Sequence, residues 1–210
     1  MSAPRSMPAL ITPFSRDGEI DGDAFAANLA ILWDRGVRGF LVAGSTGEGP
    51  YLEPGERRRL TALARRAVPD AHLVCGIAAE SLRAARSQCV QAAEGGADAA
   101  LVITPTTLIR GRDDLVRAFY EQVAGTGDLP VLLYSVPKVT GYGLPIEAVG
   151  PMSAHPSIVG IKDSSGDVGR IGPTRQAGGD GFAVYCGSTP ALAAAVEAGA
   201  DGAITASSNY

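Results

Sequence analysis

The chain has 210 residues, of which 46% are hydrophobic and 19% charged, and its formal net charge is −4. The length allows one domain with a full core, which we expect to span residues 1–210. No apolar stretch approaches the roughly 18 residues of a membrane span, no signal peptide opens the chain, and the scattered basic residues disfavour nucleic-acid binding.

Eight short apolar runs follow one another along the chain, and each is typical of a buried strand. They cover residues 9–14, 39–43, 72–77, 99–104, 130–134, 157–162, 182–186 and 202–205. Helical patterns lie between most of these runs, at residues 23–35, 53–68, 81–94 and 113–123. The sequence therefore predicts alternating strands and helices.

Three glycines mark a faint internal repeat. Gly36, Gly96 and Gly199 each end a helical pattern and lead into an apolar run, as a glycine at the end of a helix does. Eight strands of one kind, apolar nearly throughout, favour a parallel (β/α)8 barrel, the TIM barrel. A doubly wound sheet is the alternative, but the glycine fingerprint after its first strand is missing, and residues 12–14 read Thr-Pro-Phe instead.

The chain ends only a few residues after the eighth run. A complete barrel has a closing helix there, so we expect an α/β barrel that lacks its last helix and a C-terminal helical extension. The outer face of the eighth strand, including Ala203 and Thr205, would then be exposed, and exposed apolar surface favours association. We expect these 210 residues alone to be poorly soluble or inactive.

Two groups of residues give no signal of a site. The run from Arg57 to Arg59 follows a glutamate, and we interpret it as the solvated face of a helix. The cysteines at 75, 89 and 186 are odd in number and far apart, which predicts neither disulfides nor a cysteine metal site and fits a reducing cytoplasm.

Lys162 is the most informative residue, because the chain has sixteen arginines and only two lysines. It ends an apolar run, and burial would depress its pKa and free the amine to attack a carbonyl, as in Schiff-base enzymes. Arginine cannot do this chemistry because it stays protonated. The alternative is a lysine whose head reaches solvent from a strand end.

The alternation of side chains along a strand indicates which residues accompany Lys162 into the barrel. On its own run these would be Gly160 and Ile158, and on the preceding run Tyr134 and Leu132 share one face. An inward tyrosine beside an inward lysine is a proton-transfer pair. The alternative for Tyr134 is a core tyrosine that bonds a backbone carbonyl.

Polar residues collect where the runs end, which is where a barrel places its active site. The segment 44–49 reads Gly-Ser-Thr-Gly-Glu-Gly. It lacks the lysine of a phosphate loop, and its hydroxyls and amides between glycines suit a carboxylate equally well. The alternative is a plain glycine-rich turn.

Three motifs, in order and at these spacings, resemble the dihydrodipicolinate synthase and N-acetylneuraminate lyase family of Schiff-base aldolases. They are Gly-Ser-Thr-Gly-Glu at 44–48, Tyr-Ser-Val-Pro at 134–137 with Thr-Gly at 140–141, and Gly-Ile-Lys-Asp-Ser-Ser-Gly-Asp at 160–167. The resemblance covers essentially the whole chain. It implies a cytoplasmic homo-oligomer that acts on pyruvate or another 2-oxo acid without a metal or organic cofactor.

The resemblance also assigns roles to residues. Lys162 would form the imine, Tyr134 would shuttle protons, and Ser45 would belong to the same hydroxyl relay. Thr46 would hold the substrate carboxylate together with nearby backbone amides. The other residues expected to bind substrate are Gly47, Ser164 and Gly187.

Two departures from the family pattern bear on the substrate. Dihydrodipicolinate synthases usually carry an arginine where Val139 stands, and a tyrosine pair where Thr106 and Thr107 stand. The residues around Ser135 are more similar to those of 4-hydroxy-2-oxoglutarate aldolases. We therefore expect a pyruvate-dependent lyase of that aldolase type, with dihydrodipicolinate synthase as the alternative and a non-catalytic barrel that binds a 2-oxo acid as a second class.

Overall fold

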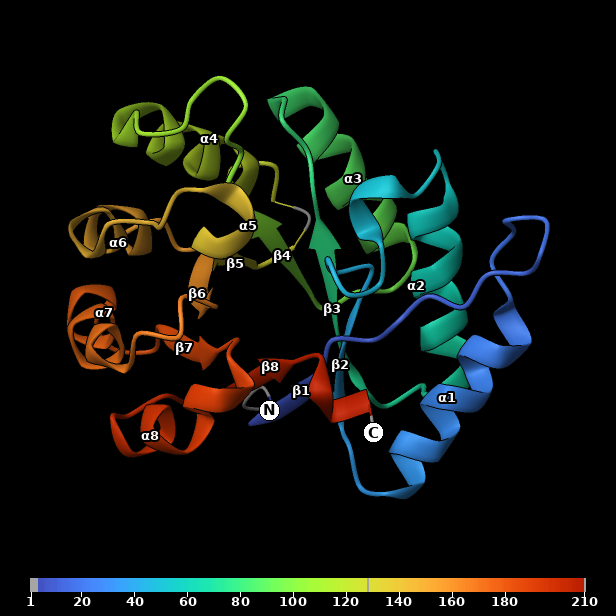
Figure 1. The fold of residues 1–210 in the computed structure, drawn as a ribbon. Coiled ribbons are helices and arrows are strands. Elements are labelled where there is room, and N and C mark those ends of the chain that lie inside the picture. The colour runs from blue at the N-terminus through green and yellow to red at the C-terminus, as the bar shows by residue number, and fades with distance from the viewer. Residues whose placement is uncertain (1–3, 128, 210) are drawn as a thin grey trace.

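The computed structural model describes residues 4–127 and 129–209, and its eight strands form one parallel sheet that curves into a barrel (Figure 1). Neighbours in the sheet follow the order β1-β8-β7-β6-β5-β4-β3-β2. The predicted parallel barrel is therefore confirmed. The strands are β1 (Ser6–Pro8), β2 (Gly39–Val42), β3 (His72–Ile77), β4 (Ala99–Ile103), β5 (Val131–Ser135), β6 (Ile158–Asp163), β7 (Ala183–Cys186) and β8 (Gly202–Thr205).

Helices surround the sheet, and Figure 1 shows the wide space that separates α8 from α1 at the bottom of the view, beside the C-terminus. None of the described helices is both long and apolar enough to cross a bilayer. The helices are α1 (Gly22–Asp34), α2 (Glu56–Ala67), α3 (Leu82–Glu94), α4 (Asp113–Ala124), α5 (Pro137–Thr140), α6 (Ile146–Ser153), α7 (Ile171–Gly178) and α8 (Leu192–Glu197).

The buried side chains form two layers. The larger cluster lies between the strands and the helices, and it contains Phe40, Leu133 and Ile161. The smaller cluster fills the barrel interior and includes Leu132 and Tyr134. Alternation along each strand sends successive residues to the two layers, so polar residues near the strand ends on the inner face meet at the mouth of the barrel.

The glycine repeat corresponds to a repeated turn. Gly36, Gly96 and Gly199 have φ values of +92°, +90° and +98°, in the left-handed region that follows many helices and that glycine adopts at least cost. Two residues after two of them, Asp98 and Asp201 each accept a backbone N–H from the preceding strand, at 2.7 and 2.8 Å. The repeat therefore includes a side-chain contact that joins neighbouring strands.

The first strand begins earlier than predicted. β1 covers Ser6–Pro8, whereas the predicted run was 9–14. Pro13 has no N–H to donate and cannot continue a ladder. The residues after β1 instead bridge two strands, because Ala9 N donates to Thr205 O on β8 and Leu10 N donates to Leu41 O on β2, both at 2.9 Å. These bonds close the barrel.

The prediction that Ile158 faces the interior with Lys162 is wrong. Val131 on β5 pairs with Ile158, but the next residue, Leu132, pairs with Gly160. This bulge inserts one residue into β6 and reverses the alternation there. Ile158 therefore packs in the outer layer. Above the bulge the alternation resumes, and Lys162 faces inward as predicted.

The expected exposure of Ala203 and Thr205 is also wrong, since both are buried. The short 3-10 turn η4 (Ser207–Asn209) folds back after β8, and the Asn209 side-chain amide donates to Ala9 O at 2.8 Å. The apolar side chains that remain exposed in this region are Ile11 on the β1 side and Ile31 on α1, at 47% and 52%.

Candidate active site

Lys162 lies on the inner face of β6 and is 4% exposed. Its Nζ lies 4.5 Å from the centre of the Tyr134 ring. Burial lowers the pKa of the Lys162 ammonium below its ordinary 10.5, and Tyr134 offsets part of this effect. A larger fraction of the amine is therefore unprotonated at neutral pH than in an exposed lysine, which is the state a nucleophile needs.

Tyr134 lies on the inner face of β5, directly across from Lys162 in the strand register. Its hydroxyl lies 3.3 Å from the Ser45 hydroxyl, which comes from the loop after β2. Its backbone is held in place by Thr104, whose hydroxyl donates to Tyr134 O at 3.2 Å. The structure thus brings together the three residues that sequence reasoning assigned to catalysis.

The 44–49 segment carries unpaired backbone donors. Gly47 N donates to Gly44 O at 3.1 Å, but the amides of Ser45 and Thr46 donate to no acceptor in the described part of the chain. The Thr12 hydroxyl, in the stretch after β1, fixes the segment by donating to Gly47 O at 2.6 Å. Two consecutive backbone amides without acceptors can bind an anion, and a carboxylate is one such anion.

Ser164 and Gly187 lie against the Lys162 side chain. A Cβ on Gly187 would overlap the Ser164 hydroxyl and lie 2.9 Å from Cε of Lys162, so only glycine fits there. The Ser164 hydroxyl is buried and has no hydrogen-bond partner among the described residues. A buried hydroxyl without a partner is costly, and here it lies next to the nucleophile, where a bound molecule could satisfy it.

The residues beside the catalytic ones have structural roles. Asp163 is buried and pairs with Arg170, with Oδ2 and Nε 3.0 Å apart. The Ser135 hydroxyl accepts the amide of Leu144 at 3.2 Å. Both side chains therefore hold the ends of β6 and β5 in place, and neither of these contacts is made inside the barrel.

The interpretation of the arginine run as a solvated face is wrong for its first member. Arg58 and Arg59 have side chains that are more than half exposed, but Arg57 is 3% exposed. Its guanidinium donates hydrogen bonds to backbone carbonyls at the two ends of the loop after β2. The signal was available in the sequence, because Arg57 lies three and four residues before Leu60 and Thr61, which form the buried stripe of α2.

The two rim positions that depart from the family pattern carry uncharged side chains. Val139 is 70% exposed and offers no charge. The amides of Thr106 and Thr107 both donate to one carboxylate oxygen of Glu80, at 3.0 and 2.9 Å. The loop after β4 is therefore held against the loop after β3.

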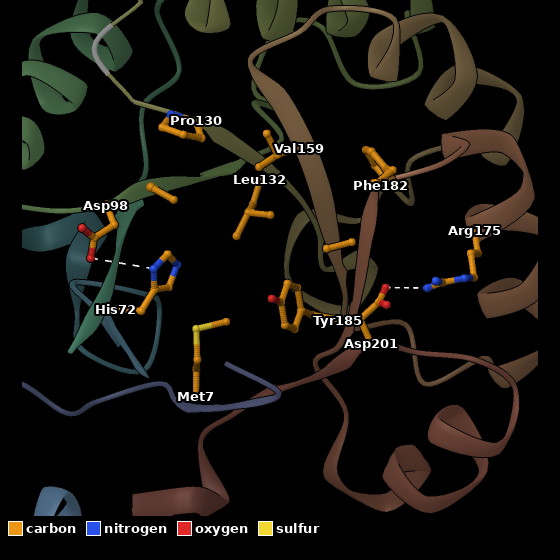
Figure 2. Close-up of a pocket in the computed structure, with 13 residues that line it drawn as sticks. Met7, His72, Asp98, Pro130, Leu132, Val159, Arg175, Phe182, Tyr185 and Asp201 are labelled. Carbon is orange, nitrogen blue, oxygen red and sulfur yellow. Dashed lines mark hydrogen bonds and ion pairs between the residues drawn. The ribbon is translucent and has the colours of Figure 1, made fainter. Parts of the chain in front are cut away.

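The enclosed space at the mouth is small. It measures about 20 Å³ beside Ser45 and Tyr134, which holds one or two waters. A cavity of about 420 Å³ lies at the opposite end of the barrel, where the strands begin (Figure 2). The charged groups there already have partners, since Arg175 pairs with Asp201, and the N-terminal face of a barrel normally serves stability. The candidate site therefore remains at the mouth.

No cluster of three or more histidine, cysteine, aspartate or glutamate side chains suited to a metal occurs among the described residues. The candidate residues at the mouth are a lysine and a tyrosine, and both side chains lie inside the barrel.

Comparisons with known proteins agree with this geometry. The model of the dihydrodipicolinate synthetase family matches residues 2–210. The 4-hydroxy-tetrahydrodipicolinate synthases of Xylella fastidiosa (strain Temecula1) and Stenotrophomonas maltophilia (strain R551-3) are 37% and 38% identical over all 210 residues, which cover 69% and 70% of those proteins. These names leave the alternative of a non-catalytic barrel without support.

Solved structures give the same result. Dihydrodipicolinate synthase from Acinetobacter baumannii, solved with pyruvate, has a TM-score of 0.94 and 30% identity, covering 99% of this chain and 72% of that one. YagE from E. coli K12, a prophage protein of the same family in complex with pyruvate, has a TM-score of 0.91 and 30% identity, covering 98% and 70%. The chain therefore belongs to the dihydrodipicolinate synthetase family, whose members are carbon–carbon lyases that work through a Schiff base.

Proposed function

We propose that Lys162 forms an imine with the ketone of pyruvate or a related 2-oxo acid. The observation that carries this is the buried amine 4.5 Å from the Tyr134 ring, on the inner face of the barrel. The neutral amine attacks the ketone carbon, Tyr134 donates a proton to the departing oxygen, and water leaves. The carboxylate binds at the free amides of Ser45 and Thr46, which orients the ketone toward Lys162.

The protonated imine then serves as an electron sink. Loss of a proton from the adjacent carbon gives an enamine, which attacks an aldehyde to form a carbon–carbon bond, and the reverse sequence breaks one. Tyr134 and Ser45, whose hydroxyls lie 3.3 Å apart, carry the protons between the carbon next to the imine and solvent.

The comparisons favour a synthase as the first candidate for the second substrate. The named relatives are 4-hydroxy-tetrahydrodipicolinate synthases, which supports condensation of pyruvate with aspartate semialdehyde over the aldolase activity that the motifs indicated. Retro-aldol cleavage of a 4-hydroxy-2-oxo acid is the second candidate. It is favoured by the exposed, uncharged Val139 at the rim.

One pair of assays separates the candidates. A version extended at its C-terminus to the length of the relatives is incubated with pyruvate and aspartate semialdehyde, and separately with 4-hydroxy-2-oxoglutarate. Efficient condensation supports the synthase, and faster cleavage supports the aldolase. If pyruvate and borohydride together fail to inactivate the protein, the imine mechanism itself is refuted.

We also propose that the enzyme works in the cytoplasm as a homo-oligomer. All three cysteines are buried, and no disulfide occurs within the described residues. Leu108 and Tyr51, in the loops after β4 and β2, are 90% and 81% exposed, and large exposed apolar side chains favour an interface. Light scattering on the extended version tests this, since a monomer at micromolar concentration would contradict it.

A further inference from the structure

Arg57 occupies a position that helix electrostatics disfavour. It lies in the first turn of α2, where the partial positive charge of the helix end repels a cation. It is also buried, and burying a charge is costly unless it is well paired. Some other interaction must therefore favour arginine at this place.

The guanidinium of Arg57 donates to three backbone carbonyls and also interacts with the buried Cys75 thiol. One terminal nitrogen donates to Gly76 O at the end of β3 and to Ala43 O, the latter at 3.4 Å, and the other donates to Gly49 O at 2.7 Å. No carboxylate lies within 4 Å of this guanidinium in residues 4–127 and 129–209. The positive charge is therefore solvated by carbonyl dipoles but not neutralised.

Two of these three carbonyls bracket the 44–49 segment. Ala43 precedes it and Gly49 ends it, and the arginine joins both to the end of the neighbouring strand. The backbone between them is strained, since Ala43 and Glu48 have φ values of +53° and +56°, a conformation that costs a residue with a side chain roughly 1–2 kcal/mol. A rigid contact is needed to keep both residues there.

The strained turns expose the amides that face the mouth. With Ala43 and Glu48 left-handed, the amides of Ser45 and Thr46 have no acceptor in the described chain. The two ends of the segment lie directly against each other, because a Cβ on Gly49 would overlap the Ala43 carbonyl. The arginine thus holds an anion-binding loop open and places a net positive charge behind it.

We propose that Arg57 is a positioning residue that adapts this loop to the carboxylate of the 2-oxo acid, by fixing its shape and by contributing a buried positive charge. The proposal rests on the function proposed above. Loss of Arg57 should therefore weaken binding of an anionic substrate more than binding of its neutral analogue. Loss of a purely structural residue would weaken both equally.

The test compares pyruvate with ethyl pyruvate, which keeps the ketone and lacks the charge. Equilibrium affinity for each is measured by calorimetry with the extended wild type, Arg57→Gln and Arg57→Lys. We expect Arg57→Gln to lower the affinity for pyruvate about 10- to 100-fold more than that for the ester, the size expected for loss of a buried positive charge close to the bound carboxylate. Arg57→Lys keeps the charge and should show a smaller difference between the two ligands.

Each variant is judged by the ratio of its affinities for pyruvate and for ethyl pyruvate. A general loss of folded protein lowers both affinities equally and leaves this ratio unchanged. Arg58→Gln removes an exposed arginine from the same turn and should leave the ratio unchanged. An unchanged ratio in Arg57→Gln overturns the proposal. Borohydride trapping of wild type with pyruvate reports separately on the imine, so a protein that binds pyruvate but is not trapped refutes the proposed function and leaves the role of Arg57 supported.

Discussion

At the scale of single residues, burial of Lys162 links activity to stability. The folded-state pKa lies below the unfolded value of 10.5, so below the folded pKa both states are protonated and the folded state bears the full cost of a buried charge. Between the two values the unfolded state binds more protons, and stability rises with pH. Burial of Lys162 therefore makes its amine more reactive and lowers the free energy of unfolding.

Lys162→Met should remove that cost. We expect it to raise the free energy of unfolding at about pH 7 by roughly 1–3 kcal/mol, the usual penalty for an unsatisfied buried polar group, with the gain shrinking as the pH nears 10.5. Urea denaturation at two pH values measures this. Lys138→Met, at an exposed position, should change neither value, and a destabilised Lys162→Met would show that the amine is satisfied by contacts we have not identified.

Tyr134→Phe tests the proton donor. The ring remains, so pyruvate should still bind, while imine formation slows and turnover falls by roughly 10²–10⁴-fold, the usual contribution of a positioned acid or base. Steady-state kinetics with single-turnover trapping separates the two effects. Tyr142→Phe removes a hydroxyl that donates to Asp113 at 2.6 Å on the outer side of the barrel and serves as the control. An equal loss of turnover in Tyr134→Phe and Tyr142→Phe would show that Tyr134 is not the proton donor.

At the scale of elements, the turn after β7 limits the space around the nucleophile. Gly187→Ala should lower stability by roughly 1–3 kcal/mol, as overpacking does, and should displace the stem of Lys162, slowing trapping by pyruvate. Gly172→Ala is the matched control, because a Cβ there meets nothing within 4 Å on α7. Alanine favours a helix by roughly 0.5–1 kcal/mol over glycine, so this control should gain stability. Normal trapping in Gly187→Ala would contradict the proposed contact.

The elements also show where sequence reasoning succeeds. On β5 the alternation is uninterrupted, so the inward faces of Leu132 and Tyr134 followed from spacing alone. On β6 the bulge beside Val131 reversed the face of Ile158, and no residue pattern announces such an insertion. Arg57 was misread because its charge suggested solvent, although its helical spacing placed it on the buried stripe.

At the scale of the whole molecule, the barrel was predictable because eight apolar runs of one kind admit few architectures. The position of the first strand was not, because the backbone bonds that close the barrel depend on β8, about 200 residues away. The substrate was not predictable either. The motifs favoured an aldolase, the relatives favour a synthase, and the rim residues that decide between them follow no pattern shared with either group.

A groove beside α1 predicts a gain in stability from a C-terminal extension. It measures about 310 Å³ and is lined by Ile11, Ile31 and Asn209 among others, and the chain spans about 70% of its relatives. A version carrying the C-terminal region of such a relative should melt several degrees higher and turn over faster than the 210 residues alone. Equal melting temperatures and rates would show that these residues are self-sufficient.

The central claim, that Lys162 is the imine-forming nucleophile, has one direct test. The extended wild type, Lys162→Arg and Lys138→Arg are each treated with borohydride in the presence of pyruvate. The masses of the intact proteins and of their peptides are then measured by mass spectrometry. We expect one reduced pyruvate on wild type and on Lys138→Arg, located on the peptide that contains Lys162, and none on Lys162→Arg. Labelling of Lys162→Arg, or of the peptide that contains Lys138, would contradict it.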